Sequence, residues 1–136
     1  MKLVISSTIM EELQALAMQN APHEICGIMF GDSKRVDDTQ ICENVAADPE
    51  RHFEINPREL IAAEREMRAG GRKIIGYFHS HPSGKVEPSR TDAASAAADG
   101  RIWLILNGKK AAAWVSVKRG EIFNRFDPIR MECPLD

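Results

Sequence analysis

The sequence has little cysteine, no long apolar run and no excess of charge of one sign. Its cysteines, Cys26, Cys42 and Cys133, are odd in number and lack CxxC spacing. This pattern argues against a disulfide framework and favours a reducing cytoplasm. The apolar runs are too short to cross a bilayer, and the first residues lack the apolar segment of a signal peptide. Because 18 basic and 20 acidic residues give a net charge of −2, neither a nucleic acid nor an anionic membrane is expected as a partner.

The composition that remains is that of an ordinary globular protein. Hydrophobic residues make up 43% and charged residues 28% of the 136 residues. A chain of this size can build one core without a metal or disulfide staple. We therefore predict a single domain over residues 1–136, located in the cytoplasm. The sequence carries no signal for an oligomeric state.

Apolar periodicity and turn signals predict strands that alternate with helices. Helices are expected at 8–19, 57–69 and 89–98. Because the last strands are joined by short turns, the sheet should be mixed, with helices packed on its faces. The predicted fold class is α/β, a single-domain mixed β-sheet flanked by helices. The tail after Pro128 is expected to be loosely held, and strands are expected at 2–5, 25–30, 35–45, 52–55, 74–81, 101–106, 111–117 and 121–126.

Two of these helices carry specific start signals. Ser6, Ser7 and Thr8 all offer N-caps to the first helix, and Thr8-x-x-Glu11 fits a capping box. Asn56 precedes a proline at the first helical position of the second helix. In that helix we expect Glu64 to pair with Arg68, and we expect the core to receive Leu60, Ile61, Ala63 and Met67.

His79 and His81 end an apolar run of strand type. Successive side chains of a strand point to opposite faces, so these two imidazoles share a face and Ser80 points the other way. Pro82 then ends the strand pairing because it has no N–H to donate. Such a pair could simply be two partly buried histidines at a strand end.

Ser89 and Asp92 follow the histidines at close spacing. Ser-x-x-Asp before an alanine-rich run is also the pattern of a helix capping box. Both roles are compatible, because a carboxylate fixed at a helix start can still face a metal. Two neutral imidazoles and one carboxylate form the ligand set typical of catalytic zinc, whose fourth position is left for water. His52 or His23 could instead close the site as a fourth ligand.

Hydrolysis at such a site also needs a general base and a group that stabilises the oxyanion. Glu24 is the best candidate for the base, since it lies between a turn and a strand that is apolar on both faces. It could also be a solvated acid at a strand start. Ser89 could donate a hydrogen bond to the oxyanion, or serve only as an N-cap.

Glu24 in the segment 22–31, then His79-Ser-His81-Pro, then Ser89-x-x-Asp92 resemble the JAMM (MPN+) metalloprotease family. The order and spacing of all five polar residues match, and the resemblance covers essentially the whole chain. It implies a cytidine-deaminase-like (JAMM/MPN) fold. It also implies that His79, His81 and Asp92 bind one Zn²⁺ per chain, that Glu24 is the general base, and that Ser89 steadies the tetrahedral intermediate.

The resemblance further implies a class of substrate. Family members cut amide or isopeptide bonds at the C-terminal tail of ubiquitin and ubiquitin-like proteins, and small prokaryotic members act on sulfur-carrier or other ubiquitin-like proteins. The expected partner is thus a ubiquitin-like or sulfur-carrier protein. The short connections of this chain leave no room for the long insertions that shape substrate grooves in eukaryotic deubiquitinases.

Four alternatives stay open at this point. One is a phage-tail-type peptidase with the same site, although nothing in the sequence suggests a partner domain for cell-wall hydrolysis. A non-catalytic MPN interaction module that retains zinc would be favoured by loss of Glu24 or of a ligand, and none is missing. A RadC-like protein shares the Pro-Ser-Gly that follows the histidines and the Pro88-Ser89 pair. Cys26 could act as a thiol nucleophile, although its position in an apolar run favours a small buried residue with a raised thiol pKa.

Overall fold

The computed structural model describes residues 1–82 and 84–135, and within them the chain forms seven strands and three helices. The helices are α1 (Ser7–Asn20), α2 (Pro57–Arg68) and α3 (Arg90–Ser95). The strands are β1 (Lys2–Val4), β2 (Cys26–Asp32), β3 (Arg35–Cys42), β4 (Ile74–Ser80), β5 (Ile102–Leu106), β6 (Ala111–Ser116) and β7 (Phe126–Glu132).

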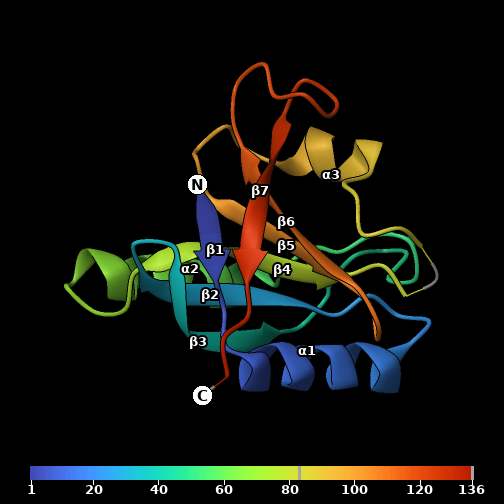
Figure 1. Cartoon of the computed structure of the whole chain (residues 1–136), viewed down its shortest axis with the longest axis horizontal. Helices are drawn as coiled ribbons and strands as arrows, with labels where there is room; N and C mark the ends of the chain where they lie inside the picture. Colours follow the sequence, from blue (N-terminus) through green and yellow to red (C-terminus); the bar gives the residue numbers. More distant parts are fainter. Residues whose placement is uncertain (83, 136) are drawn as a thin grey trace.

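The seven strands form one closed, strongly curved sheet in the order β1-β3-β2-β4-β5-β6-β7 (Figure 1). β4 is parallel to β5 and antiparallel to β2, so the predicted mixed sheet is confirmed. β1 pairs in parallel with both β3 and β7, which closes the ring. This closure was not predicted, because a strand of three residues carries almost no periodic signal.

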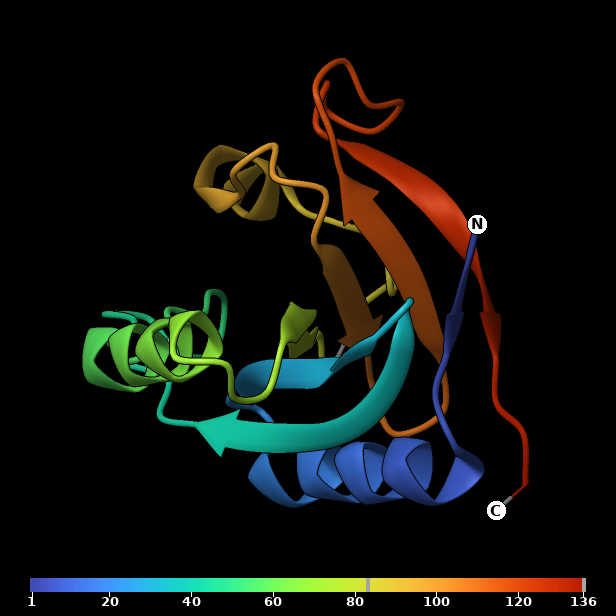
Figure 2. The same ribbon diagram turned by 90° about the vertical axis from the view of Figure 1, so that its left-hand side faces the viewer.

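α1 and α2 pack against opposite faces of the sheet. Figure 2 shows α1 beneath β2 and β3, and α2 to the left. Apolar residues of α1 pack with Phe78 and Leu104 in one core cluster. A second cluster joins Ala63 of α2 to Ile28 and Phe30 of β2. A third lies beside α3 and contains Ala96, Trp103, Ile105, Trp114 and Phe126.

The helix boundaries agree with the prediction to within one residue except at the end of α3. The N-cap of α1 is Ser6, whose side chain accepts a hydrogen bond from the N–H of Ile9, so the capping box at Thr8 was wrong. α3 ends at Ser95 instead of residue 98. Asn56 does cap α2, as predicted, and accepts from the N–H of Arg58.

The structure differs most from the prediction in the C-terminal part of the chain. Residues 121–125 form turns, because Phe123 and Asn124 have φ values of 49° and 58°, outside the extended region. The last strand is β7, which holds residues 129–132, and the carbonyl of Pro134 accepts the N–H of Ser7, so this part of the tail is not loose. Pro128 itself lies opposite Trp114 of β6.

Smaller corrections concern residues 43–68. Residues 52–55 form no strand, only a single bridge between Asn44 and Ile55. In α2 the side chain of Ile61 is 50% exposed instead of buried. Glu64 pairs with Arg101 of the strand edge at 2.6 Å, not with Arg68, because the helix is packed close to the start of β5.

None of the helices in the described part of the chain is both long enough and apolar enough to cross a membrane.

Candidate functional site

The pairing of β2 with β4 brings Glu24 next to the two histidines. Cys26 lies opposite His79 in this antiparallel pair. The same register, continued two residues along each chain, sets Glu24 opposite His81 on the same face. One ligand atom from each of Glu24, His79 and His81 lies within 4.8 Å of the others. Residues far apart in the sequence are thus joined by strand register alone.

α3 adds a second carboxylate to this cluster. Asp92 accepts the backbone N–H of Ser89 on Oδ2 at 2.9 Å, and the hydroxyl of Ser89 accepts the N–H of Asp92 at 3.0 Å. The capping box predicted from the sequence is therefore present. The same Oδ2 lies 3.2 Å from Nε2 of His79 and 3.3 Å from Nε2 of His81. The carboxylate caps its helix and faces the histidines at once.

Nε2 of His79, Nε2 of His81 and Oδ2 of Asp92 have the spacing that tetrahedral zinc requires. The two Nε2 atoms of His79 and His81 are 3.1 Å apart, and each is within 3.3 Å of Oδ2 of Asp92. Zinc bonds of about 2.0–2.1 Å at tetrahedral angles set ligand atoms roughly 3.3 Å from one another. The donor set therefore fits a zinc ion, and the side of the triangle not covered by a ligand remains for a fourth partner.

The tautomer of His81 suits a metal ligand. Its Nδ1 lies 2.9 Å from the carbonyl oxygen of Lys85. A carbonyl only accepts, so Nδ1 donates and Nε2 presents its lone pair to the cluster. Within residues 1–82 and 84–135, the buried Oε1 of Glu24 and Nδ1 of His79 have no hydrogen-bond partner. An unpaired carboxylate oxygen beside the triangle is suited to a water or a proton.

Burial and charge shift the pKa values of the cluster in different directions. Burial raises the pKa of Glu24 to about 7, with the charge of Asp92 adding to the rise and that of His81 opposing it. Burial also lowers the pKa of His79, which favours its neutral form. For Asp92, burial acts to raise the pKa, but the close contacts with the two imidazoles and the N–H of Ser89 outweigh burial, so that the pKa is lowered. Near neutral pH the cluster thus holds a fixed carboxylate and a second carboxyl able to take or give a proton.

A cavity of about 270 Å³ opens onto this cluster. Glu24, His81 and Ser89 all line it. Since the oxygen of Ser89 already accepts from the N–H of Asp92, its own hydroxyl proton is left to donate into the cavity. The structure brings all five residues singled out in the sequence to one place. His23 and His52 are exposed and belong to no metal-type cluster of the described residues.

The family model described as prokaryotic homologs of the JAB domain matches residues 6–120. The chain belongs to the prokaryotic JAB-domain family. This confirms the resemblance to small prokaryotic members of the JAMM/MPN family. The fold agrees: a JAB1/MPN domain protein from Archaeoglobus fulgidus is similar with a TM-score of 0.60 at 16% identity, over 96% of this chain and 97% of that one. The solution structure of a protein from Desulfitobacterium hafniense has a TM-score of 0.80 at 27% identity, over 100% of this chain and 94% of that one.

The curated relatives of this JAB domain include cleaving enzymes. A desampylase from Haloferax volcanii is 32% identical over 100 residues, which are 72% of each chain. A desampylase from Pyrococcus furiosus is also 32% identical over 100 residues, 73% of this chain and 71% of that one. A probable TtuB-protein conjugate cleaving protease from Thermus thermophilus is 28% identical over 90 residues, 66% of this chain and 60% of that one. The chain is a JAMM-type hydrolase.

The thiol alternative has little support in this JAB domain. Cys26 is wholly buried in β2, and burial raises the pKa of its thiol to about 12, with Cys42 adding to the rise. A thiol with such a pKa is protonated near neutral pH and is a poor nucleophile.

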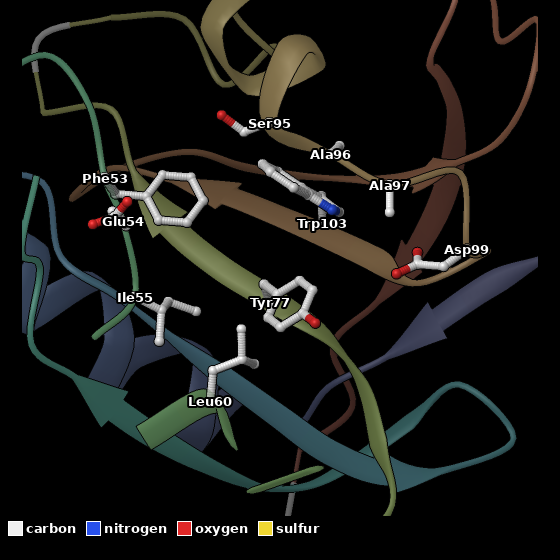
Figure 3. A pocket seen from close by; sticks show the side chains of 10 residues that line it. All are labelled: Phe53, Glu54, Ile55, Leu60, Tyr77, Ser95, Ala96, Ala97, Asp99 and Trp103. Carbon is white, nitrogen blue, oxygen red and sulfur yellow. The ribbon is translucent and has the colours of Figure 1, made fainter. Parts of the chain in front are cut away.

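Sequence reasoning missed the residues that hold the cluster from behind. The ring of Phe53 stacks on His79 with centroids 4.2 Å apart, and Trp103 meets the same imidazole edge-on at 5.6 Å. Both rings, with Tyr77 from the same face of β4, line a mostly apolar cavity of about 230 Å³ (Figure 3). Phe53 lies in irregular chain, so no periodic pattern could have marked it. The other residues that line this cavity are Glu54, Ile55, Leu60, Ser95, Ala96, Ala97 and Asp99.

Proposed function

We propose that this chain is a zinc-dependent peptidase or isopeptidase that hydrolyses an amide bond at the C-terminal tail of a ubiquitin-like or sulfur-carrier protein. The observation that carries the proposal is the triangle of two Nε2 atoms and one carboxylate oxygen, with Glu24 beside it in the same cavity. The names of the desampylases and of the conjugate-cleaving protease support this class of substrate.

His79, His81 and Asp92 would hold one zinc ion per chain. When bound, zinc supplies a Lewis acid that makes water a nucleophile near neutral pH and polarises the substrate carbonyl. The carbonyl of Lys85 keeps His81 in the tautomer that such binding needs, and the helix start of α3 keeps Asp92 directed inwards.

Glu24 would take the proton from the attacking water and pass it to the leaving amine. A general base works best when its pKa lies near the working pH, and burial brings the carboxyl of Glu24 to about 7. Its Oε1 has no partner among the described residues, which suits an atom that receives a proton during the reaction. The hydroxyl of Ser89, which lines the same cavity as Glu24, would donate to the oxyanion.

The substrate tail would lie in the cavity that Glu24, His81 and Ser89 line. Glycines near the cut bond would let the substrate backbone approach the histidines closely. The apolar cavity of Figure 3 shares the rings of Phe53 and Trp103 with the surroundings of His79, so it would take an apolar side chain further along the same tail.

The test is cleavage of fusions between candidate ubiquitin-like proteins and a reporter, read by intact mass to locate the cut bond. We expect cleavage directly after the tail, abolished by a chelator and restored by zinc. Zinc binding without cleavage of any fusion would favour the alternative of a non-catalytic module that retains zinc. Cleavage that persists in chelator would contradict the metal mechanism.

A further inference from the structure

The side-chain amide of Asn44 uses its whole hydrogen-bonding capacity. Nδ2 donates to the carbonyl oxygens of Glu24 at 3.0 Å and of His52 at 3.1 Å. Oδ1 accepts the backbone N–H groups of Ala46 at 3.0 Å and of Glu54 at 3.1 Å. An asparagine amide has two donor hydrogens and two acceptor lone pairs, so all four are used. No sequence motif marks this residue.

Two of these bonds lie on either side of Phe53. The carbonyl of His52 and the N–H of Glu54 are the groups that flank it, and one amide of Asn44 contacts both. Phe53 in turn stacks on the imidazole of His79, with an angle of 21° between the rings. Because His79 is wholly buried, this ring limits how far the imidazole can tilt.

A third bond holds the peptide unit that follows Glu24. The carbonyl of Glu24 accepts from Asn44, while its N–H donates to the carbonyl of Pro49 at 2.7 Å. Both partners belong to residues 44–56, which form a loop with one bridge and no regular strand. A side chain therefore supplies the donor that a neighbouring strand would otherwise supply.

We infer that Asn44 is a positioning residue that sets Glu24 relative to His79. It holds the backbone of the proposed base with one bond and the ring behind the proposed ligand with two others. The inference rests on the proposed function. A general base must lie within hydrogen-bond reach of its proton, and small displacements at such distances are costly in rate.

The two halves of the amide can be separated by mutation. Asn44→Asp keeps an oxygen that accepts from Ala46 and Glu54, but it places a second oxygen against the carbonyls of Glu24 and His52. Asn44→Ala removes all four bonds. Asparagine at position 20 offers a matched control, because its Nδ2 also donates to a backbone carbonyl, that of Leu16 at 2.9 Å, on an exposed part of α1.

The experiment measures kcat, KM and zinc affinity for Asn44→Asp, Asn44→Ala and Asn20→Asp. For Asn44→Asp we expect kcat to fall about tenfold or more, which corresponds to about 1.4 kcal/mol of lost transition-state stabilisation. Its KM and zinc affinity should stay within about twofold, and Asn20→Asp should match the wild type. A general loss of structure would instead lower zinc affinity and kcat together.

Two further measurements exclude a merely structural role. In the Glu24→Gln background, Asn44→Asp should no longer lower the residual kcat, because the group through which it acts is already gone. An undiminished effect in that background would overturn the inference. Amide hydrogen exchange should accelerate at Ala46 and Glu54 in Asn44→Ala but much less in Asn44→Asp, and unchanged exchange in both would also overturn it.

The failures of the two proposals are distinguishable. If the wild type cleaves a fusion and Asn44→Asp cleaves it at the same rate, only the positioning role fails. If the wild type cleaves no fusion at all, the proposed function fails, and the positioning role fails with it.

Discussion

The two sides of the cluster are built in different ways. His79, His81 and Asp92 lie close together in the sequence, and their geometry is set by the end of one strand, one short turn of helix and the carbonyl of Lys85. Glu24 is positioned by residues distant in the sequence, through the register of β2 with β4 and through an irregular loop whose Pro49 accepts the N–H of Glu24. The side with the three proposed ligands, called here the ligand side, is therefore a local structure, whereas the side with the proposed base, called here the base side, depends on the global fold.

The largest effect is expected from breaking the ligand side. His79→Ala should abolish zinc binding and reduce hydrolysis to background, because two remaining ligands do not make the usual three-ligand site. Zinc content by mass spectrometry and cleavage of a fusion measure this directly. A variant that holds zinc as tightly as the wild type would remove His79 from the ligand set.

Breaking the base side should spare the metal. Glu24→Gln keeps the shape of the side chain but cannot take a proton, so kcat should fall roughly 10²–10⁴-fold with zinc content unchanged. Single-turnover kinetics on the zinc-loaded variant give the rate. Unchanged turnover would exclude Glu24 as the base, and loss of zinc would make it a ligand.

A third substitution tests the tie between the two sides. The hydroxyl of Ser80 accepts the N–H of Ile25 at 2.8 Å, one residue beyond Glu24. Ser80→Ala should leave that buried N–H unpaired and cost about 1–3 kcal/mol in the free energy of unfolding. We also expect a lower kcat with little change in zinc affinity.

Urea unfolding and steady-state kinetics on Ser80→Ala provide both readings. Ser116→Ala is a matched control, since Ser116 of β6 is equally buried and its hydroxyl donates a hydrogen bond to the carboxylate of Asp99. This control should lose stability without losing kcat. An equal loss of kcat in both variants would contradict a specific role of the Ser80–Ile25 hydrogen bond in catalysis.

The pH dependence of the metal-free protein tests the base side alone. The pKa of Glu24 is raised by burial from 4.5 to about 7. A raised pKa means that the stabilising contribution is complete below about 4.5 and is lost as the pH rises through 7. The thermal midpoint of the metal-free wild type should therefore fall between pH 5 and pH 8 relative to Glu24→Gln, by calorimetry. Parallel curves for the two proteins would contradict this origin of the shift.

The smallest effect is expected at Cys26. Cys26→Ser should retain zinc and most of the turnover, because burial raises the pKa of the thiol to about 12 and a protonated thiol is a poor nucleophile. Cleavage of a fusion measures the effect. Loss of activity with zinc retained would restore the thiol as a nucleophile.

The same difference decides how much the sequence could predict. His79, His81, Ser89 and Asp92 lie close together in the sequence. The alternation of side chains along a strand and a capping pattern were therefore enough to place them together. Glu24 could be proposed as the base from its place between a turn and an apolar strand, but its position beside the histidines depends on the register of two strands, which no local pattern shows. Phe53 and Asn44 could not be found, because their contacts come from a loop whose path depends on the folded neighbours.

The fold shows the same limit. The helix starts and most strands follow from capping residues and apolar runs. The start of β7 was missed because Phe123 adopts a positive φ, which is rare for a bulky side chain and invisible in the sequence. The closure of the sheet was missed because β1 is too short to carry a sequence signal for pairing with β3 and β7.

Because of this closure, the three residues of β1 form the strand pairings on both of its sides. β1 pairs with β7 at Lys2–Arg130, Leu3–Met131 and Val4–Glu132, and with β3 at Val4–Arg35. If β1 detaches, the edges of β3 and β7 are left bare together, each with unpaired backbone groups that can template pairing with another molecule. The first strand therefore guards the protein against edge-to-edge aggregation, a task separate from catalysis.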